Sequence, residues 1–175
     1  MSFSFLKSKE SKEVIFVVGK PYSGKTHNCR KLVESNPSIA LIGGGVVGGE
    51  GSLDDKIRDI VGAISSNATA TKFLIDGFPT KIEEVGLWTD TAGQHGLSLS
   101  CVLYLSCPDD ILITRAREGG FVTGEEEEAT LFMRLVDAQN DMAPVIAHFA
   151  SLGLLKEVAT DQDEDAVFEF FTQNF

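Results

Sequence analysis

The chain has 175 residues with a formal net charge of −11, and 43% of its residues are hydrophobic. That length is enough for one compact domain, and the composition excludes a disordered chain. The acidic excess disfavours nucleic acids and anionic membranes as partners, because both would be repelled. No apolar stretch approaches the ~20 residues that a membrane-spanning helix needs.

The domain organisation is simple. We interpret residues 1–12 as a polar N-terminal tail without a secretory signal, and residues 13–175 as a single domain. The three cysteines, Cys29, Cys101 and Cys107, follow no metal-ligand spacing. We interpret them as buried thiols of a protein in a reducing, intracellular compartment, and we expect a cytoplasmic location.

Hydrophobic runs that predict buried strands alternate with segments that predict helices. The predicted strands cover residues 14–18, 39–42, 73–75, 98–105 and 154–158. The predicted helices cover residues 24–35, a segment that begins near 52, and residues 81–94, 108–118, 129–152 and 164–171. This alternation without a hairpin signal predicts a three-layer α/β/α sandwich around a parallel five-stranded sheet.

A phosphate-binding motif stands between the first predicted strand and the first predicted helix. Residues 19–26 read G-K-P-Y-S-G-K-T, a full match to the P-loop pattern G-x-x-x-x-G-K-[ST]. Gly19 and Gly24 let successive backbone N–H groups converge on phosphate oxygens at a helix N-terminus. We expect Lys25 to reach the β- and γ-phosphates of ATP and the Thr26 hydroxyl to ligate Mg²⁺. The sequence thus predicts a fold of the P-loop nucleoside triphosphate hydrolase type.

The other residues of the loop and one later aspartate complete the predicted nucleotide site. Pro21, Tyr22 and Ser23 belong to the same nucleotide-binding loop. Lys20 adds a second cation that either touches phosphate or points into solvent, and we favour solvent. Asp76 ends a hydrophobic strand and is a candidate Mg²⁺-site and catalytic acid, with a purely structural turn or helix-cap aspartate as the alternative.

Four segments resemble the adenylate kinase and UMP/CMP kinase family: VIFVVGKPYSGKT, FLIDGFPT, CVLYLSCPDDILITRAREGG and MRLVDAQNDMAPVIAHF. The resemblance covers most of residues 13–172, and its second and third segments are fairly specific to that family. It implies that MgATP donates a phosphoryl group to a nucleoside monophosphate. It also implies that Arg115 packs on the adenine, and that Lys25, Asp76 and Arg134 serve the transfer.

Several segments depart from the family pattern. Thr80 replaces the arginine of D-G-F-P-R, and Tyr22 replaces a common P-loop glycine. The lid segment, residues 123–128, carries four glutamates and no arginine. These carboxylates would repel a triphosphate unless they form a solvated helix start. The glycine-rich residues 43–51 stand in for the family's monophosphate-binding flap.

Two interpretations of function stay open. The first is a nucleoside monophosphate kinase of reduced activity, whose acceptor is held by residues 43–51 together with Lys56 or Arg58. The second is a catalytically impaired nucleotide-binding or structural subunit of a larger assembly, such as a cytoskeletal or ciliary one. The intact P-loop favours the first interpretation, and the lost arginines favour the second.

Overall fold

The computed structural model describes residues 11–175. The tail predicted for residues 1–12 lies almost entirely outside the described residues, and Lys12 already belongs to the first strand. The strands are β1 Lys12–Gly19, β2 Ile39–Ile42, β3 Lys72–Asp76, β4 Leu97–Ser106 and β5 Leu155–Ala159. Each predicted strand is therefore present, with small shifts of its ends.

The helices also follow the predicted order. They are α1 Lys25–Ser35, α2 Leu53–Ser66, α3 Ile82–Gln94, α4 Asp109–Glu118, α5 Glu125–Ser151 and α6 Glu164–Thr172. The start predicted for the fifth helix at residue 129 was wrong, because α5 begins at Glu125. Its four glutamates fill the first turn, where the positive end of the helix dipole favours acidic side chains.

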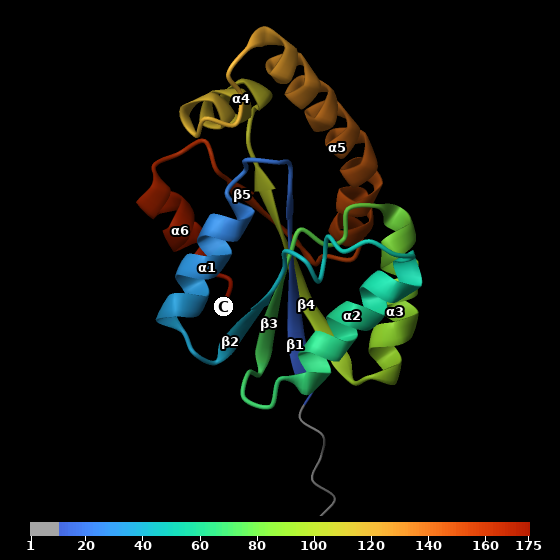
Figure 1. Ribbon diagram of the computed structural model, residues 1–175. Helices are drawn as coiled ribbons and strands as arrows, with labels where there is room; N and C mark the ends of the chain where they lie inside the picture. Colours follow the sequence, from blue (N-terminus) through green and yellow to red (C-terminus); the bar gives the residue numbers. More distant parts are fainter. Residues whose placement is uncertain (1–10) are drawn as a thin grey trace, which may run out of the picture.

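The sheet is parallel throughout, with the strand order β2-β3-β1-β4-β5. Helices α1 and α6 cover one face, and α2, α3 and the C-terminal half of α5 cover the other (Figure 1). This arrangement confirms the predicted three-layer α/β/α sandwich with a five-stranded parallel sheet.

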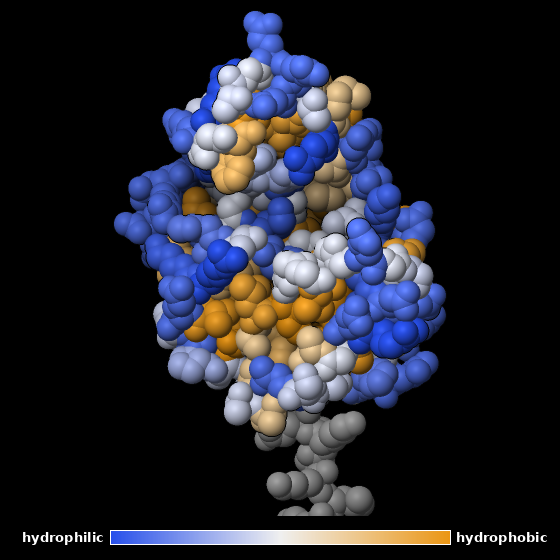
Figure 2. Space-filling view, viewed as in Figure 1, coloured by the Kyte–Doolittle hydropathy of each residue, from blue (hydrophilic) through white to orange (hydrophobic). Residues whose placement is uncertain are grey.

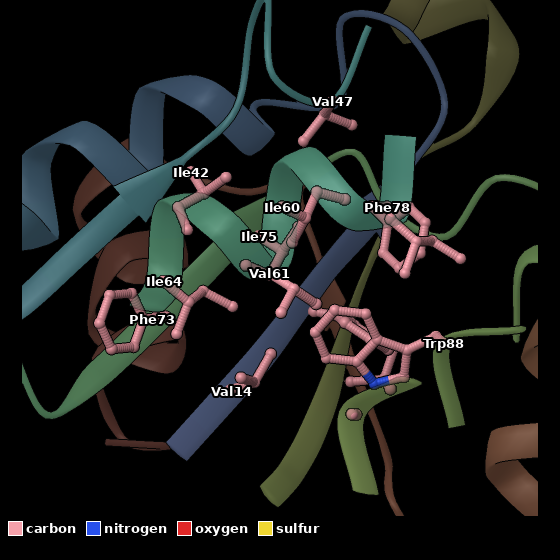
Figure 3. Packing of buried hydrophobic residues seen from close by; sticks show 14 of the residues in the cluster. Val14, Ile42, Val47, Ile60, Val61, Ile64, Phe73, Ile75, Phe78 and Trp88 are labelled. Atoms are coloured by element: carbon pink, nitrogen blue, oxygen red, sulfur yellow. The ribbon is translucent and has the colours of Figure 1, made fainter. Parts of the chain in front are cut away.

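The core explains why the central strands are uniformly apolar. Side chains of β1 alternate between the two faces, so both sides of the strand are buried under helices. Phe16 packs edge-on against Phe78 and Trp88, with ring centroids 5.3 and 5.2 Å away. Figure 3 shows Trp88 beside the apolar side chains of α2 that face the sheet. Trp88 is 3% exposed and therefore belongs to the core.

The carboxyl ends of the inner strands β1 and β3 lie next to each other at the C-terminal end of the parallel sheet. Val17 pairs with Asp76 in the parallel register, and Gly19 pairs with Leu105 of β4. The chain leaves β1 toward α1 on one face and β3 toward α3 on the other (Figure 1). In open α/β sheets, the crevice at this end of the strands is where ligands bind.

A smaller apolar cluster forms away from the two main cores. It joins α4 to the first half of α5, above the sheet in Figure 1. Its buried members are Leu112, Ala116, Val122, Leu131 and Leu135. Tyr22 of the phosphate loop packs against this cluster. The cluster therefore links the segment between α4 and α5 to the carboxyl end of the sheet.

The surface is mostly hydrophilic in the view of Figure 2. The largest hydrophobic area lies between α1 and α2, where the edge strand β2 lies, and a smaller one lies near α4 and the first half of α5. Among residues 11–175, no helix combines the length and the apolar composition required to cross a membrane.

Candidate nucleotide-binding site

The phosphate loop bends between β1 and α1 in a way that requires glycine at two positions. A Cβ atom at Gly19 would lie 2.6 Å from Ser23 Oγ and 2.8 Å from the Leu105 carbonyl oxygen, so no side chain fits there. Gly24 has a φ of 94°, in the left-handed region that glycine adopts without strain. Ser23 Oγ is buried without a hydrogen-bond partner. Together, these features keep a close-packed bend at the N-terminus of α1.

Lys25 lies across the start of this bend. Its Nζ donates hydrogen bonds to the carbonyl oxygens of Gly19 at 2.7 Å and Lys20 at 2.9 Å. Burial lowers the pKa of Lys25, while the negative charge of Asp76 opposes that shift. Burial is also the main reason why the pKa of the Cys29 thiol, which lies beneath the loop, is raised. The loop thus carries an ammonium group bound to carbonyl oxygens.

Thr26 and Asp76 meet at the end of β3. Thr26 Oγ1 donates to Asp76 Oδ2 at 2.5 Å, and Asp76 is 8% exposed. The glycine-rich segment reaches the same carboxylate, because a Cβ at Gly43 would lie 3.1 Å from Asp76 Cβ. A hydroxyl and a carboxylate are oxygen donors that suit Mg²⁺, which commonly takes its other ligands from water and substrate phosphates. The donor set at this position therefore fits the predicted magnesium site.

The solvent-facing position expected for Lys20 was wrong. Lys20 Nζ lies 2.7 Å from Asp109 Oδ1, and its side chain is only 14% exposed. Asp109 is the first residue of α4, whose N-terminus lies beside the phosphate loop. The second lysine of the loop is therefore bound to a carboxylate on the neighbouring helix.

Tyr22 is the loop residue whose conformation the sequence did not reveal. Its φ of 65° makes it the one non-glycine residue with positive φ among residues 11–175. A left-handed conformation costs a residue with a side chain about 1 kcal/mol. The centroid of the Tyr22 ring lies 5.5 Å from the centroid of the Phe121 ring. The family commonly has a glycine at this position, and that glycine is the signal from which the positive φ could have been predicted.

Arg115 lies on the other side of the loop, next to the chain that follows β5. Its guanidinium donates to the Tyr22 carbonyl at 3.3 Å and to the Thr160 carbonyl. It lines a pocket of about 270 Å³ that also includes Asn28 and Gln162. The structure thus brings Arg115 to the phosphate loop, as its predicted adenine-side role requires, although the role itself stays a prediction.

Arg134 reaches the same region from α5. It lines a cleft of about 440 Å³ whose other walls include Lys25, Thr80, Asp137 and Asp141. The two aspartates follow Arg134 at intervals of three and seven residues, so they share its face of the helix. Sequence reasoning missed them, although this helical spacing could have identified them. The cleft therefore combines two cations with two carboxylates.

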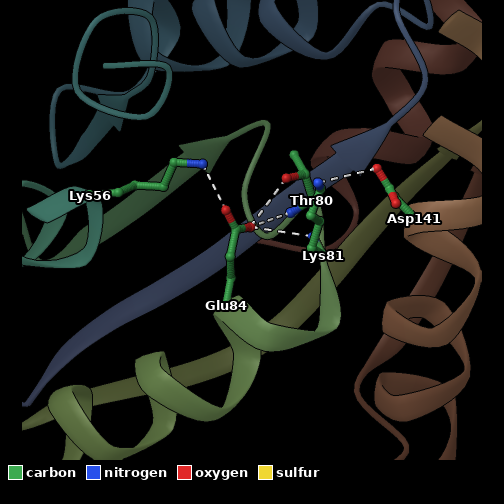
Figure 4. Close-up of polar contacts among 5 residues, drawn as sticks. All are labelled: Lys56, Thr80, Lys81, Glu84 and Asp141. Atoms are coloured by element: carbon green, nitrogen blue, oxygen red, sulfur yellow. Dashed lines mark hydrogen bonds and ion pairs between the residues drawn. The ribbon is translucent and has the colours of Figure 1, made fainter. Parts of the chain in front are cut away.

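The position of the missing family arginine is occupied by an internal polar network (Figure 4). Glu84 is 1% exposed, and its Oε2 accepts hydrogen bonds from the Thr80 backbone at 2.6 Å, the Thr80 hydroxyl at 3.3 Å and the Lys81 backbone at 3.4 Å. Its Oε1 accepts from Lys56 Nζ at 2.7 Å. Burial acts to raise the pKa of Glu84, but the hydrogen bonds and charge of Lys56 and the backbone donors outweigh it and lower the pKa.

The two cations proposed for the acceptor side point in different directions. Lys56 extends from α2 toward Glu84, whereas Arg58 pairs with Asp55 and keeps 73% of its side chain exposed. Lys81 Nζ lies 3.9 Å from Asp141 Oδ2 of α5. Both lysines near Thr80 are therefore paired with carboxylates of the same chain.

The glutamates of the lid segment are held by local contacts. Glu127 accepts hydrogen bonds from the backbone and hydroxyl of Thr123, at 2.6 and 2.8 Å. Glu128 pairs with Arg117 at 2.5 Å. Of the two possibilities for this run, the structure matches the solvated helix start.

The strand order, the glycine-dependent bend and the adjoining Thr26–Asp76 pair define the class of protein, which is an α/β protein with a P-loop kinase fold. No family model matches the chain.

Similar proteins of known name indicate which kinases within this class the chain resembles. UMP-CMP kinase 2 of Caenorhabditis elegans is 28% identical, with 89% of this chain and 92% of the relative aligned. Human UMP-CMP kinase is 26% identical over 93% of this chain and 96% of its own length. Uridylate kinase of Saccharomyces cerevisiae is 26% identical over 93% of this chain and 90% of its own length. These nearly full-length matches show that the chain is similar to UMP-CMP kinases and a uridylate kinase, and they support a place among the nucleoside monophosphate kinases.

Proposed function

We propose that this protein binds MgATP at the phosphate loop and transfers its γ-phosphoryl group to a nucleoside monophosphate, at a reduced rate. The observation that carries the proposal is the arrangement of Lys25, Thr26 and Asp76 at the junction of β1, β3 and α1. The relationship to UMP-CMP kinases and a uridylate kinase supports the choice of reaction.

Each donor-side residue has a chemical task in this proposal. The loop from Gly19 to Gly24 presents backbone N–H groups to the phosphates, and Lys25 moves from its carbonyl partners to the β- and γ-phosphate oxygens. Thr26 and Asp76 would hold Mg²⁺, and the bound ion would neutralise phosphate charge. Arg115 holds the adenine side.

The acceptor side is the reason to expect slow transfer. Phosphoryl transfer gathers negative charge, and one well-placed arginine can contribute a factor of about 10³–10⁵ in rate. Of the cations near Thr80, Lys56 and Lys81 are paired with Glu84 and Asp141. Arg134 remains as the cation that can face the transferring phosphate from α5.

The test measures binding and transfer separately. MgATP binding is measured by calorimetry, and ADP formation with AMP, CMP or UMP by a coupled assay. We expect binding in the micromolar range common for kinase substrates, and acceptor-dependent turnover below about 1 s⁻¹.

Three outcomes would change the proposal. Turnover well above that value would refute the reduced acceptor side, and absence of MgATP binding would refute the whole function. Binding with no transfer to any monophosphate would favour the impaired subunit.

We also propose an intracellular location, in keeping with the free thiols at all three cysteines.

A further inference from the structure

An aromatic contact joins the phosphate loop to the segment between α4 and α5. The rings of Tyr22 and Phe121 lie 5.5 Å apart with an interplanar angle of 49°. Tyr22 belongs to the loop itself, and Phe121 stands between the two helices with 67% of its surface exposed. The contact is therefore a bridge across the rim of the site and lies outside the two main cores.

Two further contacts hold the same two parts together. Lys20 pairs with Asp109 at 2.7 Å, and Arg115 donates to the Tyr22 carbonyl at 3.3 Å. Asp109 and Arg115 belong to α4 itself, whereas Phe121 follows the C-terminal end of that helix. The Tyr22–Phe121 pair thus adds to two polar contacts and to the packing of Tyr22 on the apolar cluster of α4 and α5.

Tyr22 also lines two open spaces. One is the pocket of about 270 Å³ that contains Arg115, and the other is a groove of about 480 Å³ that contains Arg134. A nucleotide with its base near Arg115 and its phosphates at the loop would pass beside this ring. Tyr22 is therefore placed to contact or confine such a ligand.

The backbone of Tyr22 adds an independent reason to assign it a role. Glycine would adopt the φ of 65° without strain, yet a tyrosine occupies the position. Strained conformations persist where surrounding contacts enforce them, and they are concentrated at ligand sites. The Phe121 ring, the Arg115 hydrogen bond and the apolar cluster of α4 and α5 hold Tyr22 in place.

We propose that Tyr22, held by Phe121, is a positioning residue for MgATP that fixes the segment between α4 and α5 against the bound nucleotide. The inference rests on the nucleotide-binding function proposed above. Aromatic packing here performs a task that charged lid residues would otherwise perform, since the lid segment carries glutamates at residues 125–128.

The experiment compares MgATP binding by calorimetry in single and double variants. Tyr22→Gly and Phe121→Ala should each raise the Kd about 5- to 10-fold, the range expected for loss of an aromatic pair. The double variant should bind no more weakly than the weaker single variant, because the two rings act as one unit. Phe132→Ala is the matched control, since Phe132 is an exposed phenylalanine of α5 outside this contact, and it should leave the Kd unchanged.

Two further readouts separate positioning from a general loss of structure. Tyr22→Gly relieves backbone strain of about 1 kcal/mol, which offsets part of the stability lost with the ring. The variant should therefore still unfold in one cooperative transition, and its melting temperature should fall by only a few degrees. Tyr22→Phe keeps the ring and should recover most of the affinity lost in Tyr22→Gly. In the transfer assay, the KM for ATP should rise while kcat changes little.

The outcomes distinguish this inference from the function on which it rests. If the wild-type protein does not bind MgATP, the proposed function fails. If it binds and both single variants stay within twofold of its Kd, the role of Tyr22 is refuted while nucleotide binding stands. Independent, multiplying effects of the two substitutions would also refute the paired arrangement.

Discussion

Lys25 on the donor side of the cleft and the two lysines on the acceptor side are bound to different kinds of group. Lys25 on the donor side is bound to two carbonyl oxygens and forms no ion pair within residues 11–175. On the acceptor side, Lys56 is paired with Glu84 and Lys81 with Asp141. A cation bound to neutral oxygens keeps its charge available for a phosphate, whereas a cation paired with a carboxylate is largely neutralised.

This difference shows that counting basic residues near a cleft is insufficient. Each side carries two lysines, but Lys20, Lys56 and Lys81 are all paired with carboxylates, so of these four only Lys25 keeps its charge available for an anionic ligand. The charge pattern therefore supports a competent donor site beside a weakened acceptor site.

The largest expected effect tests the donor side. Lys25→Ala should weaken MgATP binding by about 100-fold, because it removes charge-assisted hydrogen bonds to phosphate. It should also abolish the thermal stabilisation by MgATP. Calorimetry and thermal melts measure the two effects. Lys156→Ala, which removes an exposed lysine of β5, is the charge-matched control. Equal binding by the two variants would contradict the assignment of Lys25.

The second test removes the internal ion pair of the acceptor side. Lys56→Met leaves the carboxylate of Glu84, which is 1% exposed, with backbone and hydroxyl donors alone. We expect the free energy of unfolding to fall by about 2 kcal/mol in urea titrations. Arg58→Met is the control, because its exposed pair with Asp55 should contribute no measurable stability.

The same pair predicts a dependence on pH. Because the pKa of Glu84 is lowered in the folded protein, its contribution is complete above the ordinary glutamate pKa. It is lost as the pH falls through the lowered value, when the carboxylate becomes protonated. The stability difference between the wild-type protein and Lys56→Met should therefore shrink in strong acid. A difference that grows on acidification would show that the ion pair is not its source.

A third substitution should strengthen the acceptor side. Thr80→Arg restores a guanidinium at the cleft that contains Lys25 and Arg134. We expect kcat/KM for a nucleoside monophosphate to rise about 10-fold, less than a fully placed arginine provides, because Glu84 competes for the new cation. Coupled assays measure the change, and Thr80→Gln controls for side-chain length. An equal gain in both variants would mean that charge is not the limiting property.

The smallest effect concerns the second lysine of the loop. Lys20→Ala breaks the partly buried pair with Asp109 and should lower the free energy of unfolding by about 0.5 kcal/mol. MgATP affinity should change less than twofold, because the Lys20 ammonium is bound to α4. Denaturant titration and calorimetry provide both values, with Asp109→Asn expected to match the stability loss. A 10-fold loss of affinity would instead mean that Lys20 contacts phosphate.

The fold was predictable because each element has a strong local signal. The fully apolar run of β1 marks a strand buried on both faces, and the glycines of the loop mark the bend after it. Ser52 starts α2 with a capping box, as its sequence position suggests. The start of α5 was less predictable, because a run of glutamates fits either a solvated loop or the first turn of a helix.

The candidate site was only partly predictable for a physical reason. Thr26 and Asp76 are brought together by strand order, which the motif and the alternation of elements imply. The partners of Lys20 and Lys56 lie 89 and 28 residues away in the chain. No local pattern specifies such ion pairs, because they depend on how helices pack. The resemblance identified the lost arginine at Thr80, but not the network that replaced it.

The buried thiol beneath the phosphate loop has a practical consequence. Because the pKa of Cys29 is raised, almost no thiolate forms there. The thiolate is the nucleophile that reacts with alkylating reagents and peroxide, so Cys29 should be inert toward both. Cys101 is likewise buried, whereas Cys107, between β4 and α4, is partly accessible. A maleimide dye should therefore attach preferentially at Cys107, where its emission would report movements of α4 without the need to remove any cysteine.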